Sequence, residues 1–379
     1  MTDLEGILPL WSELEATGAE YVLASVVAVE GSSYRKPGAL MLLAQDGRRA
    51  GTVSGGCLEA EVARRAWWLT ANGPVVERYS TAADDGERPY GSGCGGAVHL
   101  LLERRQTAGP LFIALAEAFR RRIALSVATV LEGPAIGSRA IAGLSSAQPD
   151  SVLNDSALLR LAQQSLQQKA SIAQPVIAAG VESRAWADYR AARPGLWVFG
   201  AGDDARPLVR LARELGWFVA VADGRRNLAT QARFPAADSV VVLPMEDQPE
   251  SLAGLREAAS GILSRDMAVA MTHSFDQDAR MLAVLLSLEF DLAYIGVLGP
   301  RLRTRELLLE AAALLGVGDR EARVEAWLGK VHAPTGLDLG AATPASIALS
   351  ILAEAQQALT SATGLPLSQV RGDLPAPRP

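Results

Sequence analysis

From residue 195 onward, short apolar segments alternate with longer segments of helical periodicity, and this alternation limits the fold more than any other feature of the sequence. Expected strands lie at 196–199, 217–222, 239–243, 267–272 and 293–298, with helices between them. Strands separated by helices form βαβ units, whose strands pair in parallel with helices on both faces of the sheet. We therefore predict a C-terminal Rossmann-like domain with a doubly wound parallel sheet.

The N-terminal half predicts a mixed α+β domain. A helix is expected to about Ala16 and another at 57–69, with strands at 21–29, 38–43 and 49–53. Residues 144–174 are rich in Ala, Ser and Gln and contain few aromatic residues. The chain is thus expected to be an α/β protein with an N-terminal domain over 1–143, a linker and peripheral helix over 144–192, and the Rossmann-like domain over 193–379.

Composition and charge exclude several classes of protein. Apolar residues make up 49% of the chain and charged residues 21%, and the net charge is −6, which disfavours disorder and nucleic-acid binding. No apolar run reaches the roughly 18 residues of a membrane helix, and the start is acidic, so we expect a cytoplasmic protein that binds no membrane. Two cysteines and three histidines provide neither a disulfide framework nor zinc-ligand spacing.

The first strand of the second domain ends in a glycine-rich turn typical of dinucleotide binding. Gly200 allows the tight turn, Gly202 lets the backbone approach a pyrophosphate, and Asp223 is placed to accept from a ribose hydroxyl. Acidic side chains in the turn would repel a pyrophosphate, so a domain that has lost its ligand is the alternative. Arginines after Asp223 leave the choice between NAD and NADP open. The residues concerned are Asp203, Asp204, Arg225 and Arg226.

One histidine lies where open α/β sheets bind ligands. His273 directly follows the strand 267–272, at the expected carboxyl edge of the sheet. An NAD(P)-dependent oxidoreductase that uses His273 as proton donor or acceptor is therefore the alternative function. The sequence contains no serine nucleophile elbow, HExxH motif or P-loop, which removes the usual signals of hydrolases and kinases.

Three loops of the first domain combine glycines with hydroxyls, cations or a thiol. The loop 31–38 suits an oxyanion, although a solvated turn has the same composition. The loop 54–57 puts a cysteine in the first turn of a helix, where free N–H groups lower a thiol pKa or hold an anion. The loop 90–96 surrounds the other cysteine with glycines. The candidate residues are Ser32, Ser33, Arg35, Lys36, Ser54, Gly55, Gly56, Cys57, Gly93, Cys94, Gly95 and Gly96.

The thiols of the two cysteines have two interpretations. Each cysteine is compatible with a small apolar filler, the usual role of an arbitrary intracellular cysteine. If both loops line one cleft, however, Cys57 and Cys94 can together contact a soft metal or a thiolate-bearing cofactor.

Together these segments resemble the XdhC/CoxI family, the accessory factors of xanthine dehydrogenase and related molybdenum hydroxylases. Two departures fall in the second domain: Asp203 stands where the family usually has His, and Ala345-Ser346 where an acidic residue usually begins the last helix. The matching segments are 31–39, 51–59, 93–96, 199–202, 271–273, 294–299 and 332–341.

The resemblance implies a maturation factor, more a chaperone than an enzyme, that binds the molybdenum cofactor as molybdopterin or its dinucleotide. It implies that the cofactor is held for sulfuration by a cysteine desulfurase and then inserted into a xanthine dehydrogenase-like apoenzyme. Arg35 and Lys36 would meet phosphate, and Cys57 or Cys94 would lie near the molybdenum or handle sulfur. A homodimer is one of the oligomeric states that stay open.

Overall fold

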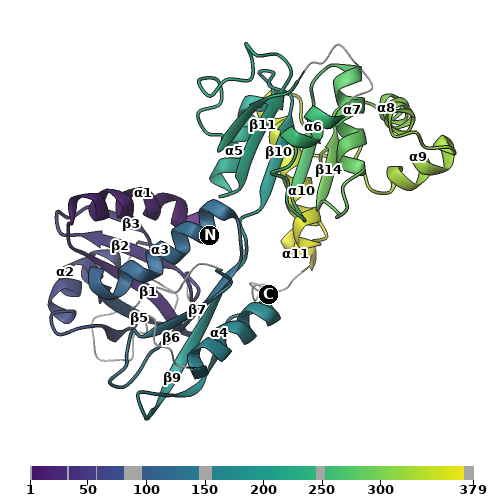
Figure 1. Cartoon of the computed structure of the whole chain (residues 1–379). Coiled ribbons are helices and arrows are strands. Elements are labelled where there is room, and N and C mark those ends of the chain that lie inside the picture. Colours follow the sequence, from purple (N-terminus) through teal and green to yellow (C-terminus); the bar gives the residue numbers. More distant parts are fainter. Residues whose placement is uncertain are drawn as a thin grey trace. The chain divides into compact units, whose positions relative to one another are not determined.

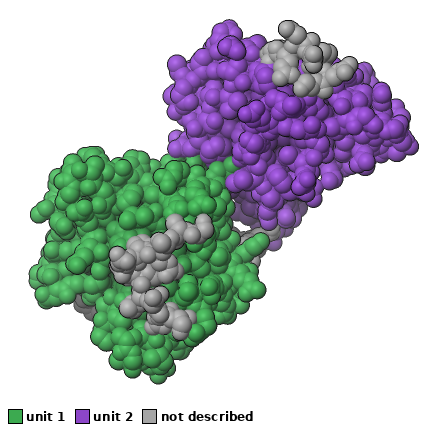
Figure 2. All heavy atoms as spheres, viewed as in Figure 1, with its two compact units in different colours: residues 1–193, 378–379 green, residues 194–377 purple. Residues whose placement is uncertain are grey.

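The structure is a computed structural model that describes residues 2–31, 34–56, 58–80, 96–144, 156–244 and 252–370. The described chain forms two compact units, one ending at Arg193 and the other beginning at Pro194, coloured separately in Figure 2. No helix within these ranges combines the length and the apolar character needed to cross a bilayer.

The first unit is built on a five-stranded antiparallel sheet of order β3-β2-β1-β5-β4 (Figure 1). Side chains alternate across its strands, so that Val22 and Ala24 pack on the α2 side, whereas Tyr21 and Leu23 pack against α1 and α3. Helices therefore cover both faces. The elements are α1 (Thr2–Thr17), β1 (Tyr21–Glu30), β2 (Leu40–Ala44), β3 (Arg49–Gly51), α2 (Glu59–Leu69), β4 (Val75–Ser80), β5 (Ala97–Arg104) and α3 (Arg105–Arg121).

A second antiparallel sheet, of order β7-β6-β9-β8, completes this unit and packs on helix α4. It differs from the expectation for 144–192, because only α4 fits a peripheral helix there, while 172–190 form a hairpin of two strands. The hairpin is stable as sheet because its small apolar side chains, Ala185 and Ala187, are buried with α4. The elements are β6 (Leu125–Val130), β7 (Arg139–Ala142), α4 (Ser156–Gln168), β8 (Ile172–Ala178) and β9 (Val181–Arg190).

The second unit has a five-stranded parallel sheet of order β12-β11-β10-β13-β14, which confirms the predicted doubly wound domain. Leu196 and Val198 pack with α5 and α10 on one face, and Trp197 and Phe199 pack with α7 on the other. The elements are β10 (Gly195–Phe199), α5 (Ala205–Glu214), β11 (Phe218–Asp223), β12 (Ser239–Val242), α6 (Ala253–Ala258), β13 (Met267–Ala270), α7 (Phe275–Leu286), β14 (Tyr294–Val297), α8 (Arg301–Leu314), α9 (Arg320–Leu328), α10 (Pro344–Thr360) and α11 (Leu367–Val370).

Candidate functional site

The loops that carry the family-like segments 31–39, 51–59 and 93–96 of the first unit are attached at the same ends of the strands of its first sheet, here called its loop edge. Glu30, the last residue of β1, pairs with Ala97 at the start of β5, and Ala97 pairs with Ser80 at the end of β4. Gly51, the last residue of β3, pairs with Met41 near the start of β2. The strand register therefore brings to one edge both ends of the segments 31–39 and 81–96 and the start of 52–58.

A buried carboxylate fixes the loop that precedes α2. Glu59 is only 4% exposed, and its oxygens accept from the Ser54 N–H at 2.8 Å, from the Ser54 hydroxyl at 2.6 Å and from the Thr52 hydroxyl. The Ser54 Oγ in turn accepts from the N–H groups of Gly56 at 3.2 Å and Leu58 at 3.1 Å. Burial by itself raises the pKa of Glu59, but the hydrogen bonds from Ser54 and Thr52 outweigh it and lower that pKa to about 2.

The cationic loop lies next to this fixed loop. A Cβ added at Gly55 would lie 3.7 Å from the ring of Tyr34, whose side chain is 74% exposed. The Arg35 guanidinium lies 6.0 Å from the centroid of that ring. Lys36 is exposed and forms no ion pair with any residue that the structure describes. Exposed glycine backbone, an aromatic ring and cations thus share one surface.

Several predicted residues lie outside the described ranges. These include both cysteines, so a metal contact by their thiols stays a prediction. Gly96 is described, and it is buried directly before β5. Among the described residues, no group of three or more His, Cys, Asp or Glu side chains could hold a metal ion. The residues outside are Ser32, Ser33, Cys57, Gly93, Cys94 and Gly95.

In the second unit, the predicted residues gather where the order of the parallel strands reverses, between β10 and β13. Gly200 has φ +132°, and a Cβ there would lie 2.4 Å from the carbonyl oxygen of Met271, so this turn requires glycine. A Cβ at Gly202 would lie 3.9 Å from Nε2 of His273, and that nitrogen lies 3.0 Å from Oδ2 of Asp204. His273 has φ +61°, which is unusual for a residue with a side chain.

Asp223 uses its carboxylate within its own unit. Oδ2 accepts from the Ala201 N–H at 2.7 Å and from Nη2 of Arg225 at 2.7 Å, and Oδ1 accepts from N and Nε of Arg225 at 2.8 and 3.0 Å. Burial raises the pKa of this carboxyl, but the bonds from Arg225 and Ala201 outweigh that effect and hold it below its usual value. With four donors bound and no exposure, Asp223 has no acceptor position left for a ribose hydroxyl in this conformation.

Other charges at this edge are also paired. Asp203 binds Arg233 at 2.8 Å, and the buried Asp278 binds Arg303 at 2.7 Å while accepting from the Thr272 hydroxyl, also at 2.7 Å. Among the described residues, these carboxylates are therefore neutralised by arginines, whereas Arg226 is exposed and forms no ion pair there.

Sequence reasoning missed a further anchor in this unit. Glu354 accepts from the Tyr294 hydroxyl at 2.6 Å and the Gly336 N–H at 2.7 Å, and its Oε1 lies 3.1 Å from Nδ1 of His332. These contacts hold the segment from His332 beside β14, where His332 bridges to Gly296. The only sequence signal is an acidic residue beside the buried stripe of α10 that contains Ala355.

Both units of the chain are similar to known proteins. Residues 14–80 match the model of the XdhC and CoxI family, and residues 196–355 match that of the XdhC Rossmann domain. A crystal structure of a Bacillus halodurans protein described as a xanthine dehydrogenase has a TM-score of 0.64 at 28% identity, covering 96% of this chain and 99% of the other.

Two curated relatives carry names related to molybdenum enzymes. A Bacillus subtilis protein, named as a probable subunit of xanthine dehydrogenase, is 30% identical over 88% of this chain and 92% of its own length. The molybdenum cofactor insertion chaperone PaoD of Escherichia coli is 33% identical over 32% of this chain and 37% of its own length. Because the similarity to the first relative spans nearly the whole of both chains, this protein belongs to the XdhC and CoxI family.

Proposed function

We propose that this protein binds the molybdenum cofactor and inserts it into a xanthine dehydrogenase-type apoenzyme. Family membership and the names of the two curated relatives support a role in the maturation of such enzymes. The observation that carries the proposal is the gathering of the signature loops at one edge of the first sheet, where Gly55 lies against Tyr34.

The residues at the loop edge of the first sheet fit the chemistry of the molybdenum cofactor. A pterin with a phosphate tail needs a planar contact, cations and backbone that tolerates close approach. Tyr34 offers an exposed ring, Lys36 an exposed cation, and no atom of the described residues lies within 4 Å of the position a Cβ would take at Gly56. The bound cofactor would supply the molybdenum chemistry used later in the client enzyme.

The chain's own contribution is binding and orientation. Lys36 and Arg35 would hold the phosphate, while Ser54 and Glu59 keep the N–H groups of the glycine loop in place. Sulfuration by a cysteine desulfurase, contacts by Cys57 or Cys94, the dinucleotide form of the cofactor, a cytoplasmic location and a homodimer are further parts of the proposal.

The decisive experiment measures cofactor on the purified protein. Expressed in a host that makes the molybdenum cofactor, the protein should retain pterin, measured as its fluorescent oxidation product, together with molybdenum. Lys36→Gln should reduce retention by about tenfold, because one charge-assisted contact is worth about 1.5 kcal/mol. Lys169→Gln, at an exposed lysine after α4, is the matched control. A protein without pterin from cofactor-replete cells contradicts the proposal.

The alternative, an NAD(P)-dependent oxidoreductase, has less support because the Asp223 carboxylate is already bound by Arg225 and Ala201. We expect no saturable change in tryptophan fluorescence with NADH or NADPH up to about 1 mM, a concentration that would detect binding of about −4 kcal/mol. Tight binding of either nucleotide would restore this alternative.

A further inference from the structure

The last residues of β9 reach across to the cationic loop of the first sheet. Nη2 of Arg190 donates to the carbonyl oxygen of Gly38 at 2.7 Å, although the two residues are 152 positions apart. The same nitrogen lies 2.7 Å from Oδ2 of Asp188. Alternation along β9 puts Ala187 toward α4, so Asp188 and Arg190 extend from the opposite face of the strand.

Gly38 is the end of the loop at which this contact acts. Its φ of +97° and a Cβ position 3.1 Å from Oδ1 of Asp188 require glycine, so the backbone bends directly against the carboxylate. The Gly38 N–H donates to the carbonyl of Val26 at 2.8 Å, and the Ala39 N–H donates to the carbonyl of Lys36 at 3.2 Å. The turn that carries Lys36 therefore ends at a backbone unit held on both sides.

The pair itself is largely buried. Asp188 is 8% exposed, and the Arg190 side chain is 13% exposed. Together with Gly38 they line a cavity of about 20 Å³ between the two sheets. Burying an ion pair costs as much desolvation energy as it returns in attraction, so stability alone does not account for this one. Its geometric effect is to fix one carbonyl, that of Gly38.

We propose that Arg190, oriented by Asp188, is a positioning residue that fixes the segment 34–38 through the Gly38 carbonyl and so sets how Arg35 and Lys36 face an anionic ligand. The inference rests on the proposed function for the identity of that ligand, a phosphate-bearing pterin. It assigns to the second sheet a role at the site carried by the first.

The loop offers a readout that does not depend on any ligand. Trypsin can cut after Arg35, whereas the bond between Lys36 and Pro37 resists it. Native-state cutting after Arg35, followed by mass spectrometry, should become about tenfold faster in Arg190→Gln, because a lost charge-assisted hydrogen bond makes local opening that much more frequent. Arg190→Lys, which keeps a charged donor, should recover part of the protection.

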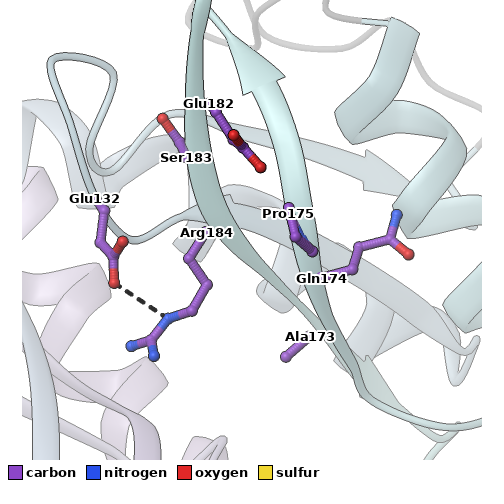
Figure 3. Close-up of a pocket in the computed structure, with 7 residues that line it drawn as sticks. All are labelled: Glu132, Ala173, Gln174, Pro175, Glu182, Ser183 and Arg184. Carbon is purple, nitrogen blue, oxygen red and sulfur yellow. Dashed lines mark ion pairs between the residues drawn. The ribbon is translucent and has the colours of Figure 1, made fainter.

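A matched control lies on the same strand. Arg184 extends from the same face of β9 and pairs with Glu132 at 3.3 Å, as Figure 3 shows, and it makes no hydrogen bond to the described residues of the loop. Arg184→Gln should leave cutting after Arg35 unchanged. Should Arg190→Gln fail to fold, Asp188→Asn with Arg190→Gln removes the unpaired carboxylate as well.

Pterin retention provides the second readout. Retention should fall about tenfold in the folded Arg190 variant and stay unchanged in Arg184→Gln. Unchanged cutting after Arg35 in a folded Arg190 variant, or equal acceleration in Arg184→Gln, overturns the positioning role. If the wild-type protein retains no pterin, the proposed function fails, while the cutting rates still decide whether Arg190 fixes the loop.

Discussion

At the loop edge of the first unit an exposed tyrosine lies against exposed glycine backbone, and an exposed lysine follows two residues later, whereas at the carboxyl edge of the second unit acidic and basic side chains bind each other. Lys36 has no ionic partner in the described structure, but Asp223 is bound by Arg225 and Asp203 by Arg233. Among the described residues, the first edge therefore leaves the charge of Lys36 without an ion pair. The second edge uses its charge to hold its own loops.

The buried carboxylates of the two units, Glu59 and Asp223, also differ in what they hold. Glu59 holds a loop whose glycines stay exposed, so its bonds prepare a surface. Asp223 takes up the N–H of Ala201, a backbone donor of the glycine turn that a pyrophosphate would otherwise use. In the first unit the Gly56 N–H is likewise bound, by the Ser54 Oγ, so what distinguishes that edge is its exposed Tyr34 ring and its exposed Lys36.

The largest expected effect is at Glu59. Glu59→Gln should cost about 3 kcal/mol locally, because an uncharged amide replaces the carboxylate and its NH2 group faces either the Ser54 hydroxyl or the Ser54 N–H in a buried position. Hydrogen exchange at the amides of Gly56 and Leu58 should accelerate by about 100-fold. Glu61→Gln, which loses a surface pair with Arg64, should change exchange by less than about threefold. Equal exchange in the two variants would contradict the anchoring role.

Lowering the pH should weaken the loop before α2 by about as much as Glu59→Gln does. Because the pKa is lowered from 4.5 to about 2, the carboxylate stabilises the folded loop fully above pH 4.5, and this contribution is lost as the pH falls toward 2. The integrated contribution is about 3 kcal/mol. A carboxyl ¹³C titration of Glu59, assigned with Glu59→Gln, should have its midpoint below pH 3. A midpoint near 4.5 would mean that the Ser54 bonds are not formed.

The second unit should show a smaller loss, without any effect on the cofactor. Asp223→Asn replaces an acceptor by a donor near Ala201 or Arg225 and should cost about 2 kcal/mol, measured as faster exchange at the Ala201 amide. Pterin retention should stay at the wild-type level. Asp203→Asn is the control, because that side chain is 82% exposed. A loss of pterin in folded Asp223→Asn would break the contrast between the two edges.

The smallest effect concerns the backbone at His273. With φ +61°, His273→Ala should be about 1 kcal/mol less stable than His273→Gly, since the left-handed conformation strains alanine and not glycine. Both variants lose the contact with Asp204 equally, so thermal unfolding of the pair isolates the backbone contribution. Equal stability of the two variants would show that this residue is not held in the left-handed region.

The Rossmann-like unit could be predicted because its information is local. Each strand from 196 to 298 is a short apolar run, and a threonine followed by a proline is an ordinary helix start, as at α10, where the Thr343 side chain accepts from the Ser346 N–H. The hairpin 172–190 could not be predicted from its Gln- and Ala-rich surroundings, because Ala185 and Ala187 become core residues only when α4 covers them.

For the site residues, the sequence predicted where each side chain lies but not which partners it binds. The motif located Asp223 at the end of β11, but which donors fill its oxygens depends on the fold of the turn that brings Arg225 back. From the sequence alone, Glu59 is an ordinary acidic residue in the first turn of a helix. Arg190 is 152 positions from Gly38, a separation that no local pattern encodes.

The hairpin of β8 and β9 decides where the protein can be divided. A fragment ending near residue 143 would keep β6 and β7 but remove the neighbour of β6 on its other side. The exposed strand edge and the uncovered alanines of β6 and β7 would favour aggregation. A recombinant first unit should therefore run to Arg193, which retains α4, both strands of the hairpin and the Arg190 contact with Gly38.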